Sequence, residues 1–246
     1  MGEPAEGGDG DATDGRGQPV RYLKRDFWST ENLKHVPAHY RLRKTARIVN
    51  GIAGERPCTL LDVGCGPATL MGLLRPNVSY FGIDIAIHDP APNLLQADIV
   101  EEPIRFGDRK FDIVVAQGLF EYLGDVQSQK FGEIADVLEA DGVFVVSYTN
   151  FGHRNKDVYW AYSNVQSLDR FRGDLGRFFT IQRAFPTAHN WHHGQPNRRL
   201  VKALNMHVNV NIPVISPALA VEYFFICSAR RSRPLGAGSG EGPPAR

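Results

Sequence analysis

The chain alternates short apolar runs with polar turns, and one pair of runs is the most informative. Leu60-Leu61-Asp62-Val63 leads into Gly64-Cys65-Gly66-Pro67, and a second run, Tyr80-Phe81-Gly82-Ile83, ends at Asp84. Short apolar runs bounded by turn residues are typical of buried strands. The two glycines permit a sharp turn and place no Cβ between the backbone and a ligand. This pattern predicts a first strand, a tight glycine turn, a helix and a second strand.

Further segments continue the alternation of strands and helices. The spacing of apolar residues predicts helices over 43–52 and 163–179. Apolar runs predict strands over 94–99, 111–118, 179–185 and 221–227, and a helix-turn-strand over 137–147. The long connection 186–220, with a helix expected near 198–206, is of a length that is usually functional or disordered in compact domains, and its aromatic content argues against disorder.

The acids around the glycine turn indicate a nucleoside-binding site and restrict which nucleoside could bind there. Asp84, at the end of the second run, is placed to accept hydrogen bonds from a ribose diol. A dinucleotide-binding turn is written G-x-G-x-x-G and holds a pyrophosphate, but Thr69 stands at the third glycine position. A carboxylate at Asp62 would repel phosphates and attract an ammonium or a sulfonium group.

The pattern D-x-G-x-G at Asp62 resembles motif I of the class I S-adenosylmethionine-dependent methyltransferases. Asp98-Ile99 resembles the end of the family's third strand, and 111–118 resembles its motif IV. The segment 137–147 resembles its L-x-P-G-G turn, with Ala140-Asp141 in place of proline and glycine. The alternative is a buried glycine turn in another α/β protein.

The resemblance holds in order and spacing over 58–148 and implies a fold, a cofactor and a set of site residues. The implied fold is α/β and Rossmann-like, with a seven-stranded, mostly parallel sheet, an antiparallel last strand and helices on both faces. The implied cofactor is S-adenosylmethionine, with Asp62 near its ammonium group, Asp84 at the ribose, and Asp98 and Ile99 at the adenine. The full predicted cofactor-binding set is Asp62, Gly64, Gly66, Asp84, Ile85, Asp98, Ile99 and Gln117.

Composition suggests one domain between two tails. Residues 1–19 are Gly- and acid-rich, and 231–246 are Pro-, Gly- and Arg-rich, so both are expected to be disordered. Residues 20–230 are expected to form a single domain with three parts: an N-terminal cap over 20–57, a cofactor-binding half over 58–148 and a substrate half over 149–230. Phe27 and Trp28 in the cap would either close over the cofactor as a lid or pack the cap onto the sheet.

Charge and hydropathy exclude several partners. The net charge is +1 and no basic stripe interleaved with aromatics stands out, so nucleic acid is not the expected partner. The three cysteines lie in or beside apolar strands and are expected to be buried and reduced. No signal peptide is visible, and the apolar stretch 212–229 is interrupted by two prolines and Glu222, which argues against a membrane span. The expected location is the cytoplasm.

Histidines gather in the loops that are expected after the fifth and sixth strands. Methyl transfer to a hydroxyl requires a base, and histidine suits that role near neutral pH. His153 and His192 are the predicted catalytic residues, with His193 and Glu121 as alternatives. The spacing His189-x-x-His192-His193 also fits a metal site, but no carboxylate lies nearby in sequence, so no metal is predicted.

These features predict a methyltransferase that acts on a small molecule. The expected reaction is O-methylation of a sugar, a glycan precursor or a specialised metabolite, and N-methylation is the alternative acceptor chemistry. The segment Ser147–His153 distantly resembles the equivalent loop of MetW-type proteins, which leaves open a cofactor-binding accessory protein that assists a partner enzyme. The sequence leaves the oligomeric state open.

Overall fold

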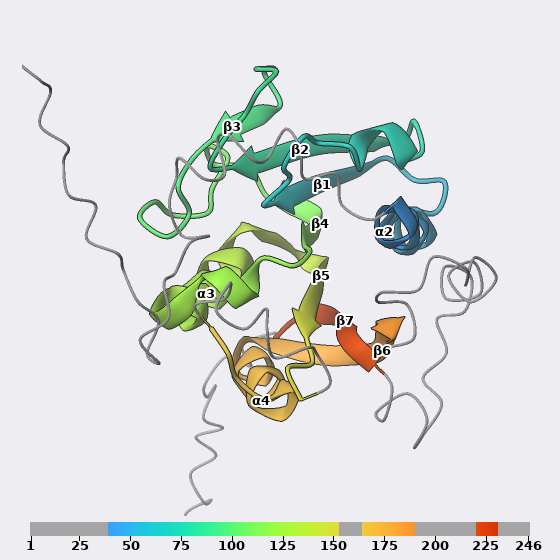
Figure 1. Cartoon of the computed structure of the whole chain (residues 1–246). Coiled ribbons are helices and arrows are strands. Elements are labelled where there is room, and N and C mark those ends of the chain that lie inside the picture. The colour runs from blue at the N-terminus through green and yellow to red at the C-terminus, as the bar shows by residue number, and fades with distance from the viewer. Residues whose placement is uncertain (1–38, 153–163, 190–219, 231–246) are drawn as a thin grey trace, which may run out of the picture.

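The computed structural model describes residues 39–152, 164–189 and 220–230, and these residues form a seven-stranded sheet (Figure 1). The strand order is β3-β2-β1-β4-β5-β7-β6, and β7 runs antiparallel to both of its neighbours. The other pairings are parallel. The strands are β1 (Cys58–Val63), β2 (Val78–Asp84), β3 (Leu94–Gln96), β4 (Phe111–Ala116), β5 (Leu138–Thr149), β6 (Phe179–His189) and β7 (Ala220–Ala229). The predicted mostly parallel sheet with an antiparallel last strand is confirmed.

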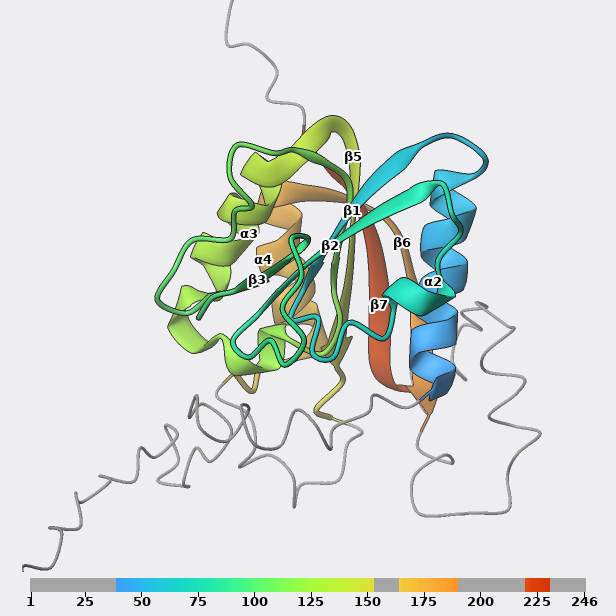
Figure 2. The ribbon, with the colours of Figure 1, turned by 90° about the horizontal axis from the view of Figure 1, so that it is seen from above.

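Helices cover both faces of the sheet, as predicted. Helix α2 (His39–Ala53) lies against one face, and α3 (Gln127–Val137) and α4 (Leu168–Phe178) lie against the other (Figures 1 and 2). Side chains alternate between the two faces along each strand. Leu60 therefore packs in the cluster that contains the apolar residues of α2, while Leu61 packs with those of α3 and α4. Because both faces are buried, β1 and β4 read as apolar runs in the sequence.

The prediction of a helix between the first two strands is wrong. Residues 64–77 contain only one short 3₁₀ helix, Met71–Leu73. The interval holds three glycines and two prolines (Gly64, Gly66, Pro67, Gly72 and Pro76). Glycine and proline are the two poorest helix formers, so the interval contains too few helix-forming residues for an α-helix after the turn.

Other boundaries differ from the prediction by a few residues. Helix α4 begins at Leu168, because the Ser167 hydroxyl caps it by accepting a hydrogen bond from the backbone N–H of Arg170 at 3.1 Å. Strand β3 ends at Gln96 instead of residue 99. In β5 the pairing with β4 moves from Leu138 to Val143 while β4 advances by two residues, so the predicted turn over 139–142 is an irregularity within one strand. The helix expected near 198–206 and the two tails lie outside the described residues.

Among the described residues, no helix has both the length and the apolar character required to cross a membrane.

The cap at Ser167 provides a direct test of the α4 boundary. We expect Ser167→Ala to lower the free energy of unfolding by about 1 kcal/mol, because one helix N–H loses its acceptor. Ser167→Asp should retain most of the stability, since aspartate also caps helices well. Urea denaturation of the wild type and the two variants checks this. If both variants are as stable as the wild type, the cap contributes nothing.

Candidate functional site

The parallel strands β1, β2, β4 and β5 all run in one direction, so their carboxyl ends meet at one edge of the sheet. The glycine turn lies at this edge. Gly64 has φ +75° and Gly66 has φ +54°, a left-handed backbone that favours glycine. The N–H groups of Gly64 and Cys65 both donate to the Ile83 carbonyl of β2, at 2.8 and 3.2 Å. The predicted tight turn is therefore present and is tied to the neighbouring strand.

Asp84, at the end of β2, braces this turn. Its Oδ2 accepts a hydrogen bond from the Gly66 N–H at 2.7 Å, and its Oδ1 accepts one from the Ala86 N–H at 3.1 Å. The side chain is buried, so these donors replace water around the carboxylate. The sequence prediction placed Asp84 beside the turn, and the structure brings the two together.

Asp62, near the end of β1, is also buried, but a side chain instead of backbone N–H groups donates to its carboxyl. Its Oδ2 accepts a hydrogen bond from the Tyr80 hydroxyl at 2.8 Å. Burial raises the pKa of the Asp62 carboxyl to about 7, and the nearby charge of Asp84 adds to the rise, while the bond from Tyr80 opposes it. The described residues supply no cation to this carboxyl, which makes it a suitable place for a positively charged ligand group.

The remaining predicted cofactor residues occupy the same edge in different environments. Gln117 follows β4: its Oε1 accepts from the Thr45 hydroxyl of α2 at 2.9 Å, while its Nε2 is buried with no acceptor among the described residues. Asp98 follows β3, and its Oδ1 accepts from the Val100 N–H at 3.1 Å. Ile99 is buried in the core cluster that includes α3, and Ile85 is half-buried directly after Asp84.

A second pair of buried carboxylates lies further along the edge. Glu121 belongs to a 3₁₀ turn after β4, and its Oε1 accepts hydrogen bonds from both the N–H and the hydroxyl of Thr149 at 2.8 Å each. Glu222 of β7 is the register partner of Thr149. Burial raises the pKa of Glu121, and the charge of Glu222 raises it further. A carboxyl of this kind is able to take up a proton nearer neutral pH than an exposed glutamate.

Two cations of α2 accompany these carboxylates. Arg41 Nη2 donates to Glu222 Oε1 at 2.5 Å. Lys44 is fully buried and donates to the Pro186 carbonyl at 2.6 Å, and burial lowers its pKa to about 8 although Glu222 opposes that shift. Arg41 also lies against the loop after β4, because a Cβ on Gly118 would lie 3.1 Å from its Nη2. Helix α2 is thus joined to β6, β7 and the β4 loop at this edge.

Sequence reasoning missed Arg41, Lys44 and Glu222 as members of the site. A signal was available for Glu222, which is a charged residue within an otherwise apolar run, and such residues are rarely buried unless they are paired. Arg41 and Lys44 stand among other basic residues at the start of α2, so no local pattern marked them. Glu222 interrupts the run Ala220–Ala229 and was read only as an argument against a membrane span. Their pairing depends on contacts between residues as far apart as 41 and 222, which no local pattern reveals.

The predicted catalytic histidines, His153 and His192, and the alternative His193 lie outside the described residues. So does most of the segment considered for a metal. Of that segment, only the backbone of His189 is described, as the last residue of β6. Within the described residues, no group of three or more His, Cys, Asp or Glu side chains could hold a metal ion.

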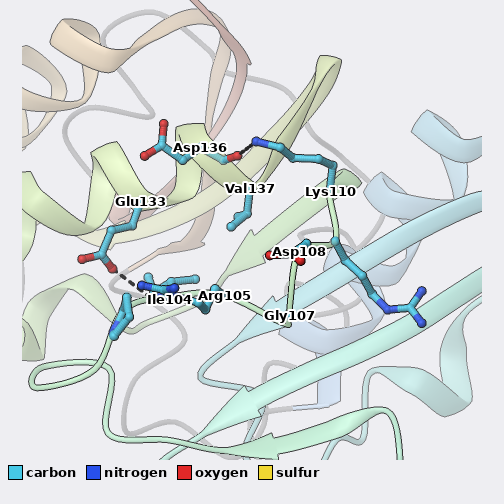
Figure 3. A pocket seen from close by; sticks show the side chains of 10 residues that line it. Ile104, Arg105, Gly107, Asp108, Lys110, Glu133, Asp136 and Val137 are labelled. Atoms are coloured by element: carbon cyan, nitrogen blue, oxygen red, sulfur yellow. Dashed lines mark hydrogen bonds between the residues drawn. The ribbon is translucent and has the colours of Figure 1, made fainter.

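A pocket of about 410 Å³ is open at the opposite edge of the sheet, where β4 and β5 begin (Figure 3). Its lining mixes both charges (Pro103, Ile104, Arg105, Gly107, Asp108, Arg109, Lys110, Glu133, Asp136 and Val137). Several of its polar groups are used internally: Glu133 accepts from the Ile104 N–H at 2.9 Å, and Lys110 donates to the Asp136 carbonyl. This pocket is separate from the glycine turn and the buried carboxylates.

Comparison with known proteins agrees with the geometry at the carboxyl edge. The sequence profile of a family described as "Methyltransferase domain" matches residues 38–185. The chain belongs to this methyltransferase family. No curated protein sequence matches it. The recognition of a class I methyltransferase from the motifs is thereby confirmed.

Solved methyltransferase structures share the fold at low sequence identity. A TehB-like S-adenosylmethionine-dependent methyltransferase from Corynebacterium glutamicum is 14% identical over 83% of this chain and 95% of that chain, with a TM-score of 0.52. The N-methyltransferase NodS from Bradyrhizobium japonicum is 13% identical over 86% and 100%, with a TM-score of 0.54. A putative methyltransferase in complex with the Haloferax volcanii activator Trm112 is 16% identical over 86% and 98%, with a TM-score of 0.56.

Gly64 allows a test of the turn. A methyl group at Gly64 would be strained by its positive φ and would lie 3.1 Å from Leu119 Cδ1. We expect Gly64→Ala to cost about 1–2 kcal/mol of unfolding free energy and to weaken binding of S-adenosylhomocysteine. Gly72→Ala is the matched control, because nothing lies within 4 Å of a Cβ there. Denaturation and calorimetry check both variants, and equal behaviour would show that the turn does not require glycine.

Proposed function

We propose that this protein transfers a methyl group from S-adenosylmethionine to a hydroxyl group of a small molecule. The observation that carries the cofactor half is the left-handed glycine turn, with buried Asp84 bonded to Gly66 and buried Asp62 beside it. Family membership supports S-adenosylmethionine as the methyl donor. A sugar, a glycan precursor or a specialised metabolite is the proposed acceptor, because the sequence has no extended basic or peptide-binding feature.

The residues at the edge fit the chemistry of this cofactor. Asp62 offers a carboxylate without a cation to the ammonium group, and Asp84 offers acceptors to the ribose diol. Gln117 Nε2 is a buried hydrogen-bond donor without a partner among the described residues. The cofactor or the methyl-accepting substrate would supply that partner. When bound, S-adenosylmethionine supplies a methyl group activated by a sulfonium leaving group.

The protein must align the acceptor oxygen with the methyl carbon at about 3 Å and exclude water. As the carbon–oxygen bond forms and the carbon–sulfur bond breaks, the sulfonium charge is lost and the hydroxyl proton passes to a base. His153 and His192 are the proposed bases. Glu121 is the candidate among the described residues, because Thr149 orients its carboxyl and burial favours proton uptake.

An amine acceptor is the second candidate. Arg41 pairs with Glu222, but the ionised carboxylate of Glu121 would still stabilise the positive charge that an amine gains on methylation. NodS, which shares the fold, is named as an N-methyltransferase. A MetW-type accessory role differs from both, since it requires cofactor binding without turnover of a small molecule.

Asp84 tests the cofactor assignment. We expect Asp84→Asn to weaken binding of S-adenosylhomocysteine at least about tenfold, because a hydrogen bond to a charged group contributes about 1.5–3 kcal/mol. Asp108→Asn is the control, since Asp108 lines the pocket at the opposite edge. Titration calorimetry that finds unchanged affinity in Asp84→Asn would remove the cofactor assignment.

A second experiment tests the acceptor and its base. The protein is incubated with S-adenosylmethionine and panels of sugars, phenols and amines, and released S-adenosylhomocysteine is measured. On the hydroxyl acceptor that responds, we expect the His153→Ala/His192→Ala double variant to lose turnover while binding the cofactor normally.

The variant Glu121→Gln separates the two possible bases. If Glu121 is the base, it acts only when ionised, so the rate falls as pH drops through its raised pKa, and Glu121→Gln abolishes turnover. If a histidine is the base, Glu121→Gln retains activity. Turnover of amines alone would replace the hydroxyl proposal, and cofactor binding with no turnover on any panel would favour the accessory role.

A further inference from the structure

We propose that Tyr80 is a positioning residue: it orients Asp62 so that the second oxygen of the Asp62 carboxyl receives the ammonium group of the cofactor. This inference rests on the proposed function, because it takes Asp62 as the residue that meets the ammonium group. It adds a residue that no sequence motif identified.

The contact that carries the inference is short and buried. Tyr80 lies on β2 opposite Leu60 of β1, and Asp62 is two residues further along β1 on the same face. The Tyr80 hydroxyl donates to Asp62 Oδ2 at 2.8 Å. Asp62 Oδ1 accepts no hydrogen bond from any described residue, so one oxygen is held and the other is available.

Packing keeps the tyrosine and the carboxyl in place. Tyr80 and Cys65 are both buried in the cluster beneath α2, and the Cys65 thiol donates to the Gly66 carbonyl at 3.7 Å. A Cβ on Gly82 would lie 2.8 Å from Cys65 Sγ, which shows how closely the thiol is packed against β2. Because the phenol ring has few ways to move, its hydroxyl fixes the rotation of the Asp62 carboxyl.

The charges around Asp62 explain why binding would release a proton. Within the described part of the chain, the titratable groups that interact with it are Tyr80 and Asp84 from β2 and Cys65 from the turn, and none of them is a cation. Burial raises the pKa of Asp62 to about 7, so the carboxyl takes up a proton far nearer neutral pH than an exposed aspartate does. An arriving ammonium group favours the ionised carboxylate, and the proton leaves to solvent.

Calorimetry with two ligands tests the inference. S-adenosylhomocysteine keeps the ammonium group, whereas 5′-methylthioadenosine keeps the nucleoside and lacks the amino-acid part. For the wild type we expect the affinity for S-adenosylhomocysteine to fall roughly tenfold from pH 8 to pH 6. We expect a net release of protons on binding at pH 7, measured in buffers of different ionisation enthalpy. The affinity for 5′-methylthioadenosine should not change over this range.

The variant Tyr80→Phe should move this pH dependence. Loss of the hydroxyl removes a contact that lowers the pKa of Asp62, so the fall in affinity begins at higher pH. At pH 7 we expect about tenfold weaker binding of S-adenosylhomocysteine and unchanged binding of 5′-methylthioadenosine. Tyr148→Phe is the matched control, because it also loses one hydroxyl hydrogen bond, to the backbone carbonyl of Asn164 at 2.9 Å, away from the turn.

Each other outcome overturns the inference in a recognisable way. If Tyr80→Phe binds S-adenosylhomocysteine like the wild type at every pH, Tyr80 does not position Asp62. If the variant weakens the binding of both ligands equally, Tyr80 supports only the turn. The variant Asp62→Asn checks the role of Asp62 separately, because it removes the titrating group while keeping the shape of the side chain. If the wild type binds 5′-methylthioadenosine but not S-adenosylhomocysteine, the role of Asp62 fails while the nucleoside site stands. Failure to bind either ligand removes the proposed function and the inference with it.

Discussion

A buried carboxylate is stable only where donors or cations replace the water that it has lost, and this constraint shapes the whole carboxyl edge of the sheet. Four such groups lie there, with exposed fractions of 6% for Asp62, 8% for Asp84, 1% for Glu121 and 4% for Glu222. Each is matched by an element from elsewhere in the fold: a strand tyrosine, a turn N–H, a threonine at the end of β5 and an arginine of α2. The hydrogen bonds and the ion pair that these acids accept therefore hold the turn, the β4 loop, β7 and α2 together.

The two pairs of acids are satisfied in different ways, and this difference separates the two parts of the site. Glu222 has Arg41 as its cation, and Lys44 lies close enough for its charge to interact with Glu222. Asp62 has only a neutral donor among the described residues. A charge-balanced cluster suits a neutral acceptor such as a hydroxyl, whereas a carboxyl without a counter-ion suits a cationic cofactor. The inferred role of Tyr80 extends this argument, because a neutral donor orients the acid without neutralising it.

Much of the sheet was predictable because its central strands are buried on both faces and read as apolar runs with clear turn residues between them. Asp84 and the two glycines were predictable for the same reason, since they lie at or just after the end of such a run. The helix after β1 was predicted wrongly, because its expectation came from the usual alternation of strand and helix and not from residues 64–77 themselves. Helix α4 was placed too early because its apolar spacing extends beyond the point where Ser167 caps it.

The sequence by itself determined the order of the strands along the chain, the position of the glycine turn and the acids that flank it, because these features depend on residues that are neighbours in the chain. Only the tertiary structure decided which charges meet. The pairing of Arg41 with Glu222, the bond from Tyr80 to Asp62 and the burial of Lys44 against Pro186 join segments that lie far apart in the chain. A charged residue in an apolar segment indicates that a partner must exist, but the partner's identity follows from packing in three dimensions.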